Sequence, residues 1–313
     1  MMYPIMERRK MREFFATLRM AIHFGLIVIS KTFYPNKTIP QHLQTRSENM
    51  PRAVSVTYRV SPTPDALAVA AAEFFTSTVA AAVKARGAAR VAVSGGTTPK
   101  AMFALLADRA APYFAQIPWD RLLIFWVDER CVPPTDTDSN YRMTDEALFS
   151  HVPLLAAQIY RMEGELDPEV AAARYEAAIR TAFRLEGAET PTFDLILLGL
   201  GEDGHTASIF PHTAAINELG RIVVANHVPQ KDTWRITLTW PVIQQGREVA
   251  FLVEGAGKAR SIYDVFLGSY DPEMRPAQLI RPASGRLTLL LDAAAASELP
   301  RLADSETVGT MEI

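Results

Sequence analysis

The side chain best suited to chemistry lies in a glycine-rich segment, Gly199-Leu200-Gly201-Glu202-Asp203-Gly204-His205. An imidazole titrates near neutral pH, at about 6.5 when unperturbed, so it can take a proton from water during attack on a substrate. Asp203 is near enough in the sequence to orient the ring or to support its protonated form. We therefore predict that His205 and Asp203 form the catalytic group, with His205 as general base.

The same segment has a second interpretation as a nucleotide-binding loop. Gly199, Gly201 and Gly204 have the GxGxxG spacing of a dinucleotide fold and follow a continuous apolar run. Glu202 and Asp203 would then lie inside the loop that holds a pyrophosphate, where like charges repel one another. These carboxylates favour a general base over a dinucleotide site.

A second glycine-rich turn, Ser94-Gly95-Gly96-Thr97-Thr98-Pro99, lies between an expected strand and an expected helix. Glycines let backbone amides approach a ligand, and Pro99 suits a first helical turn. Free amides and the helix dipole make such a turn an anion site. Gly95, Gly96, Thr97 and Thr98 are therefore predicted to bind substrate. A strand-to-helix turn with a threonine cap is the alternative.

Charged side chains follow another predicted strand. Asp128 and Arg130 leave this strand at the edge where open α/β sheets bind ligands, and Arg142 follows in the next loop. Asp128 is suited to a sugar hydroxyl group, and either arginine to a phosphate. Arg235 and Lys258, near two further strands, are candidates for the same anion pocket. For each of these residues, a solvated surface position is the alternative.

Metal and nucleophile chemistry have little support in the sequence. His212 has no third ligand at a suitable spacing to join it with His205 around a metal, and the segment 136–147 lacks the Gly and the bidentate Glu of a calcium loop. No GxSxG, HExxH or paired CxxC pattern occurs. The single cysteine, Cys131, excludes an intramolecular disulfide and indicates a reducing compartment. We predict no metal site.

Strand and helix signals alternate along the sequence. Continuous apolar runs such as 122–127 and 193–198 are typical of strands buried on both faces. We predict an α/β fold, a three-layer, doubly wound, mostly parallel sheet with helices on both faces. The expected strands are 90–94, 122–127, 193–198, 235–239, 248–253 and 287–291, and the expected helices are 64–86, 100–107, 166–185 and 258–267.

The charge distribution separates residues 1–52 from the rest. They carry nine Lys and Arg against three Asp and Glu, whereas the remainder is acidic, which argues against a general nucleic-acid surface. The apolar run 20–29 is too short to span a bilayer. We predict one α/β domain over 53–313. The leader, 1–52, is expected to be disordered or outside the native core, as a signal-like peptide, a transit peptide, or sequence upstream of a true start at Met50.

The motifs between residues 53 and 299 resemble, in order and spacing, the 6-phosphogluconolactonase family of the glucosamine-6-phosphate isomerase/6-phosphogluconolactonase superfamily. They are 94–99, 127–130, 139–142, 198–211, 235–239, 257–258 and 290–295. The resemblance implies hydrolysis of 6-phospho-D-glucono-1,5-lactone to 6-phosphogluconate in the oxidative pentose phosphate pathway, with no metal or organic cofactor. It also implies that His205 is the general base, and that the turn 95–98 and basic side chains such as Arg130, Arg142 and Lys258 hold the phosphate.

The nearest competitor of the same fold is glucosamine-6-phosphate deaminase, whose Asp-Gly-His segment continues with Phe-Asn-Glu-Pro. Phe210 stands where that family has the glutamate that works with the histidine in ring opening, and this departure favours the lactonase. The non-enzymatic alternative is a sugar-phosphate sensor, although the leader shows no DNA-reading helix pair. We expect a phosphorylated sugar lactone as partner, no nucleic acid, no membrane, a cytoplasmic location, and a monomer or small homo-oligomer.

Overall fold

The computed structural model of the protein describes residues 53–282, 284–300 and 308–313. The predicted leader lies outside the described residues, so its nature and the domain boundary at residue 53 stay predictions.

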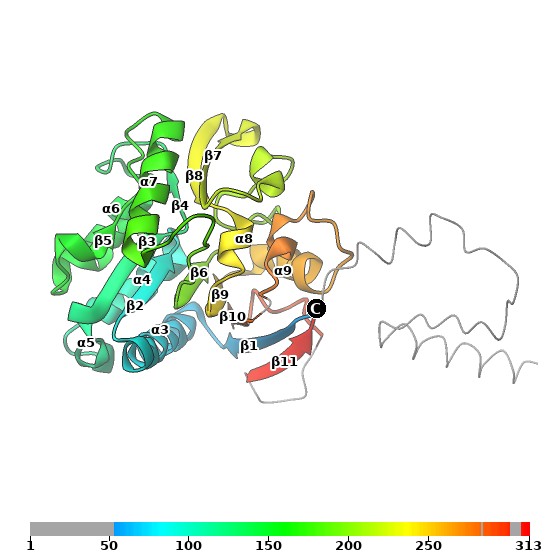
Figure 1. Ribbon diagram of the computed structural model, residues 1–313. Helices are drawn as coiled ribbons and strands as arrows, with labels where there is room; N and C mark the ends of the chain where they lie inside the picture. Colours follow the sequence, from blue (N-terminus) through cyan, green and yellow to red (C-terminus); the bar gives the residue numbers. More distant parts are fainter. Residues whose placement is uncertain (1–52, 283, 301–307) are drawn as a thin grey trace, which may run out of the picture. The chain divides into compact units, whose positions relative to one another are not determined.

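The main sheet of the described residues has eight strands in the order β11-β1-β10-β9-β6-β2-β3-β5 (Figure 1). Neighbouring strands are parallel throughout, except that β11 runs antiparallel to β1. The strands are β1 Ser55–Ser61, β2 Ala89–Val93, β3 Leu122–Trp126, β5 Ile159–Tyr160, β6 Leu195–Leu198, β9 Glu248–Val253, β10 Arg286–Asp292 and β11 Val308–Glu312.

A second, antiparallel sheet of three strands has the order β4-β8-β7. Its strands are β4 Asp128–Arg130, β7 Val223–Val228 and β8 Thr233–Leu238. The α-helices of the described residues are α3 Pro64–Arg86, α4 Thr97–Ala107, α5 Pro112–Gln116, α6 Asn140–Ala147, α7 Pro168–Phe183, α8 Trp240–Ile243 and α9 Ala259–Phe266.

The order of the strands fixes where a ligand can bind. From β1 through β2 and β3 to β5 the chain advances toward one edge of the main sheet, whereas from β6 through β9 to β10 it advances toward the other edge. Because parallel crossovers are right-handed, the two directions place α3, α4 and α6 on one face and α7, α8 and α9 on the other. The winding reverses between the neighbouring strands β2 and β6. Their carboxyl ends therefore lie side by side with an uncovered crevice between them, which is where open α/β sheets bind ligands.

Local sequence explains the elements that frame this crevice. Thr63 caps α3 by accepting a hydrogen bond from the N–H of Ala66 at 3.2 Å, and Pro64 suits the first helical turn. Gly87 ends the helix in the left-handed conformation, with φ of 77°. Every residue of β6 and β9 is buried, as expected of central parallel strands covered on both faces.

The predicted fold class is confirmed, and so is each predicted strand and helix, with boundaries that move by a few residues. One placement differs, because the predicted strand 235–239 is β8 in the small antiparallel sheet and not part of the main sheet. The strands β1, β4, β5, β7 and β11 were not predicted. β4 and β5 are only three and two residues long, too short for a periodic signal.

One helix of the described residues, α3, is long and apolar enough to cross a membrane by length and composition. Half of its most apolar stretch is buried within the fold, and it packs against α4, β1 and β10. A core helix of a globular protein has the same properties.

A tyrosine completes the main sheet where its edge strand is too short. β5 pairs with β3 at only two positions, Ile124 and Phe125, which leaves the backbone of Trp126 without a strand partner on that side. The hydroxyl group of Tyr175 on α7 accepts from the N–H of Trp126 at 2.8 Å and donates to its carbonyl oxygen at 3.0 Å. Tyr175 and Trp126 are both buried, and the chain continues from Trp126 through Val127 into β4.

We expect Tyr175→Phe to lower the free energy of unfolding by about 1–3 kcal/mol, because it leaves a buried N–H and a buried carbonyl group unsatisfied. Urea unfolding followed by circular dichroism measures the change. Tyr160→Phe is the matched control, since no hydrogen bond of the Tyr160 hydroxyl group occurs within the described residues. Equal losses in the two variants would contradict the role assigned to Tyr175.

Candidate active site

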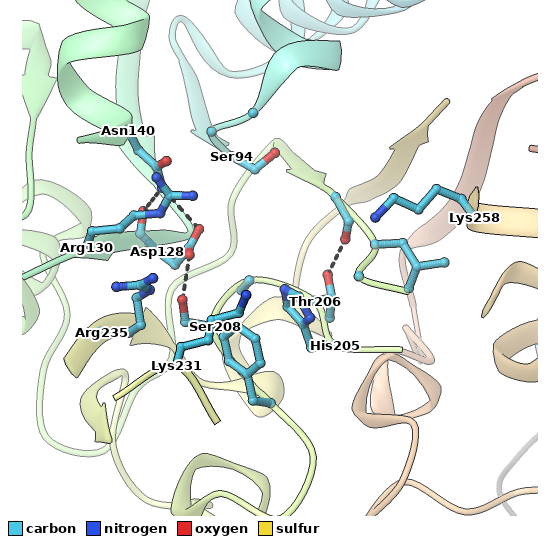
Figure 2. A pocket seen from close by; sticks show the side chains of 17 residues that line it. Ser94, Asp128, Arg130, Asn140, His205, Thr206, Ser208, Lys231, Arg235 and Lys258 are labelled. Carbon is cyan, nitrogen blue, oxygen red and sulfur yellow. Dashed lines mark hydrogen bonds between the residues drawn. The ribbon is translucent and has the colours of Figure 1, made fainter. Parts of the chain in front are cut away.

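A cavity of about 340 Å³ opens at the carboxyl ends of β2 and β6 (Figure 2). Its walls come from the turn after β2, from β4, from the start of α6, from the loop after β6 and from β8. The lining residues are Ser94, Gly95, Gly96, Asp128, Arg130, Asn140, Gly199, Leu200, Gly201, His205, Thr206, Ala207, Ser208, Phe210, Lys231, Arg235 and Lys258. The cavity lies where the reversal of the winding predicts a ligand site.

The imidazole of His205 is held at one edge by Asp203. Nδ1 of His205 lies 2.5 Å from Oδ1 of Asp203, and the same oxygen accepts from the backbone N–H of His205 at 3.1 Å. Partial burial raises the pKa of Asp203, but the hydrogen bond and the charge of His205 outweigh this effect, so the pKa lies below its usual value. An ionised Asp203 selects the tautomer with hydrogen on Nδ1, which leaves Nε2 free to accept a proton.

The glycine at position 201 makes this arrangement possible. A Cβ atom on Gly201 would overlap Nδ1 of His205 and lie 2.5 Å from Oδ1 of Asp203. The loop closes on itself because the N–H of Gly201 donates to the carbonyl oxygen of His205 at 2.8 Å. The close approach of the His205–Asp203 pair is therefore sufficient reason for a glycine at position 201.

Asp128 faces the cavity from β4 and is almost fully buried. Its Oδ2 accepts from the hydroxyl group of Ser208 at 2.6 Å, and its backbone carbonyl oxygen accepts from the amide of Asn140 at 2.9 Å (Figure 2). A buried carboxylate with lone pairs left over is suited to accept hydrogen bonds from hydroxyl groups of a polar ligand.

Glu129 points away from the cavity and connects two of its walls. One carboxylate oxygen accepts from the N–H groups of Arg130 and Asn140, and the other from the N–H of Tyr141 and the hydroxyl group of Ser139, at 2.7–3.0 Å. Burial raises the pKa of Glu129, and the backbone donors only partly offset this effect. The carboxylate thus fixes the start of α6 against β4. A solvated charge cluster, the alternative for this segment, is ruled out because Asp128 is 8% and Glu129 2% exposed.

Two arginines lie directly opposite each other at the cavity. Arg130 on β4 pairs in register with Arg235 on β8, and Figure 2 shows both side chains at the same side of the cavity. Burial, and then the charge of Arg130, lower the pKa of Arg235. Within the described residues both guanidinium groups donate only to neutral oxygens, those of Asp138, Thr233 and Trp234. Like charges in cross-strand contact are unfavourable, so this pair is suited to an anion that bridges it.

The start of α4 and Lys258 add further positive potential at the cavity. The helix α4 begins after Gly96, and no side chain within the described residues caps its N-terminus. Gly95 lies so close to Asn140 that a Cβ atom would overlap the amide group. Figure 2 shows Lys258 on the side of the cavity away from the two arginines. The free amides and helix dipole at the start of α4, beside Asn140, and the ammonium group of Lys258, on the other side, each favour negative charge.

Most of the predicted site residues meet at the cavity: Gly95, Gly96, Asp128, Arg130, His205, Arg235 and Lys258. Asp203 acts on it through His205. Three other predicted residues do not line the cavity: Thr97, Thr98 and Arg142. The hydroxyl group of Thr97 lies 3.4 Å from Glu254. The guanidinium group of Arg142 donates to Glu146 and to the carbonyl oxygen of Thr135.

Several lining residues were given no catalytic or binding role from the sequence, among them Asn140, Ser208, Phe210 and Lys231. Asn140, Ser208 and Phe210 lie inside the motifs 139–142 and 198–211. The sequence therefore indicated their segments as functional but did not indicate these particular side chains. Lys231 follows Pro229 and Gln230 in a short turn before β8, and nothing in its neighbours distinguishes it from a surface lysine.

Neither His212, considered as a metal ligand, nor the single cysteine, Cys131, lines the cavity. His212 lies 3.4 Å from Glu273 in an exposed pair, and no three His, Cys, Asp or Glu side chains converge as metal ligands in the part of the chain that the structure describes. Burial raises the pKa of Cys131 to about 11, so its thiol is a poor nucleophile.

Comparison with known proteins identifies relatives over most of the described residues. A family model described as glucosamine-6-phosphate isomerases/6-phosphogluconolactonase matches residues 62–289. The 6-phosphogluconolactonase of Synechocystis sp. is 40% identical over 225 residues, which cover 72% of this chain and 90% of that protein. The solved 6-phosphogluconolactonase of Trypanosoma brucei superposes with a TM-score of 0.68 at 29% identity, over 79% of this chain and 100% of that one. A monomeric glucosamine-6-phosphate deaminase shares the fold, with a TM-score of 0.64 at 19% identity, over 77% of this chain and 99% of that one.

We expect inorganic phosphate to bind at the facing arginines. Arg235→Gln should weaken phosphate binding about 10- to 100-fold, because it removes a charge-assisted hydrogen bond worth about 1.5–3 kcal/mol. Isothermal titration calorimetry at low ionic strength measures the affinity.

Arg142→Gln is the matched control and should leave phosphate affinity unchanged, because its guanidinium group is held by Glu146 outside the cavity. If Arg142→Gln weakens binding as much as Arg235→Gln does, the phosphate lies elsewhere.

Proposed function

Because the chain belongs to the glucosamine-6-phosphate isomerase/6-phosphogluconolactonase family, we propose that it opens its lactone substrate with water activated by His205. Its relatives at 38–40% identity are 6-phosphogluconolactonases, so the chain is an enzyme that hydrolyses 6-phospho-D-glucono-1,5-lactone in the oxidative pentose phosphate pathway. The observation that carries the mechanism is the His205–Asp203 pair at the cavity wall.

The reaction needs one proton to move twice. Nε2 of His205 takes a proton from water while the water oxygen attacks the lactone carbonyl carbon. When the tetrahedral intermediate collapses, the bond between this carbon and the ring oxygen breaks, and the imidazolium returns the proton to the ring oxygen. The products are a hydroxyl group and a carboxylic acid, and the acid releases the second proton of the water to solvent to give the carboxylate of 6-phosphogluconate. The ionised Asp203 stabilises the imidazolium between the two transfers.

The charges of the cavity orient the substrate. The phosphate binds at the facing guanidinium groups of Arg130 and Arg235, with Lys231 beside them. The lactone carbonyl then points toward the opposite end, where Lys258 stabilises the developing oxyanion. Asp128 accepts a hydrogen bond from a sugar hydroxyl group between the two ends.

The same distribution of charge suits the product, because 6-phosphogluconate carries a phosphate at one end and a carboxylate at the other. The deaminase alternative lacks a group in this cavity, since position 210, which carries the glutamate in the deaminase motif, is here the phenylalanine whose ring stacks on the face of His205. We place the enzyme in the cytoplasm, consistent with its free Cys131.

We expect His205→Gln to lower kcat about 10²- to 10⁴-fold, the usual contribution of a general base, while the KM for the lactone changes little. The substrate is generated in situ by oxidation of the sugar phosphate, and spontaneous hydrolysis is subtracted. A sugar-phosphate sensor would show no turnover above the spontaneous rate in the wild type and would bind ligand equally well in the variant. Wild-type turnover by His205→Gln would refute the mechanism.

Gly201→Ala should reduce kcat about 10²-fold, because a methyl group at this position must displace the His205–Asp203 pair by the order of 1 Å. KM should stay close to that of the wild type, since the facing arginines are untouched. Gly220→Ala is the control, because its Cβ atom would meet only a carboxylate oxygen of Glu218 at an ordinary 3.5 Å. Equal kcat values for the two variants would show that the close approach at Gly201 does not matter.

A further inference from the structure

An aromatic contact defines the orientation of the proposed base. The ring of Phe210 stacks on the imidazole of His205, with ring centroids 3.9 Å apart and an interplanar angle of 21°. The chain turns back between the two residues, because the N–H of Ile209 donates to the carbonyl oxygen of Thr206 at 3.0 Å and Ala207 adopts a positive φ of 49°. Phe210 is 3% exposed although it lines the cavity.

The hydrogen bond to Asp203 does not by itself fix the imidazole. A ring held only at Nδ1 can tilt about that contact, and the tilt displaces Nε2 at the opposite edge, where the proton is exchanged with water. A flat ring in van der Waals contact with the face of the imidazole opposes the tilt, because the rings would either collide or lose their contact. The two contacts restrain different motions of the same ring.

Phe210 is itself anchored to the second sheet. Its carbonyl oxygen accepts from the hydroxyl group of Thr213 at 2.7 Å, and this hydroxyl accepts from the amide of Asn226 on β7 at 3.0 Å. The same amide donates to the carbonyl oxygen of Ser208 at 2.9 Å. Both ends of the turn that carries Phe210 are thus tied to β7, which pairs with the strand of Arg235.

We propose that Phe210 is a positioning residue for the hydrolysis, which holds the plane of the His205 imidazole so that Nε2 points at the attacking water. This inference rests on the proposed function, because it assigns Phe210 its effect through His205. The competing explanation is that Phe210 only fills space in the apolar core. The two explanations differ in whether the flat aromatic face or only the apolar volume matters.

Two substitutions separate these explanations. Phe210→Leu keeps an apolar side chain but removes the flat face, and should lower kcat about 10-fold or more at an unchanged KM, because misplacement of a catalytic group by the order of 1 Å costs up to about 10²-fold. Phe210→Tyr keeps the face and should retain most of the wild-type kcat. If Phe210→Leu is too unstable to purify, Phe210→Met replaces it, and thermal unfolding confirms that each variant is folded at the assay temperature.

The imidazole can also be observed without substrate. In ¹⁵N-labelled protein we expect the wild type and Phe210→Tyr to show one His205 tautomer, with hydrogen on Nδ1, and ring protons shifted by the stacked ring. In Phe210→Leu the ring-current shift should vanish and the two nitrogen signals should move toward averaged values. A leucine variant with wild-type nitrogen signals, or with wild-type kcat, would overturn the proposal. Equal losses of kcat in the leucine and tyrosine variants would do the same.

The His205→Gln variant distinguishes failure of the proposed function from failure of the proposed role of Phe210. If that variant retains turnover, the proposed function of His205 fails, whatever the Phe210 variants do. If it loses turnover while Phe210→Leu does not, the general base stands and only the positioning role of Phe210 fails.

Discussion

The reversal of winding between β2 and β6 is the constraint from which the site follows. Helices that follow strands on either side of this point leave in opposite directions, so the carboxyl ends of the two strands stay uncovered. The two glycine-rich segments lie at this opening because each directly follows one of the two strands. The cavity is a consequence of chain order, and the side chains only determine what it binds.

Three consecutive residues of β4 show how burial divides functions between neighbours. Side chains alternate along a strand, so Asp128 and Arg130 face the cavity while Glu129 faces the protein interior. A buried carboxylate is costly unless it is fully hydrogen-bonded, and Glu129 accepts four hydrogen bonds, three of them from the start of α6. The hydrogen bonds that offset the burial of the Glu129 carboxylate therefore hold the start of α6 at a fixed distance from β4. These two elements are walls of the same cavity.

The sequence predicted what depends on short-range pattern and missed what depends on register. The central strands were predictable from continuous apolar runs, and His205 from its glycine-rich surroundings. In contrast, the contact between Arg130 and Arg235 arises from the pairing of β4 with β8, more than a hundred residues apart. Arg142 resembles Arg130 in the sequence, but a carboxylate four residues further along its helix, Glu146, holds it outside the cavity. A sequence pattern shows which residues carry charge, and only the fold decides which charges meet.

The fold itself does not choose between ring hydrolysis and isomerisation, since a deaminase at 19% identity shares it. The choice between the two reactions depends on the side chain that lies against the face of the His205 ring. A carboxylate at position 210, in addition to Asp203 at the Nδ1 edge of the imidazole, would accept and return protons, as an isomerisation with several transfers requires. The buried phenyl ring of Phe210 cannot exchange protons, and in our proposal its stacked face holds the plane of the imidazole. Hydrolysis of a lactone needs only one base, which moves a proton from water to the ring oxygen, so a phenyl ring at position 210 favours hydrolysis over isomerisation.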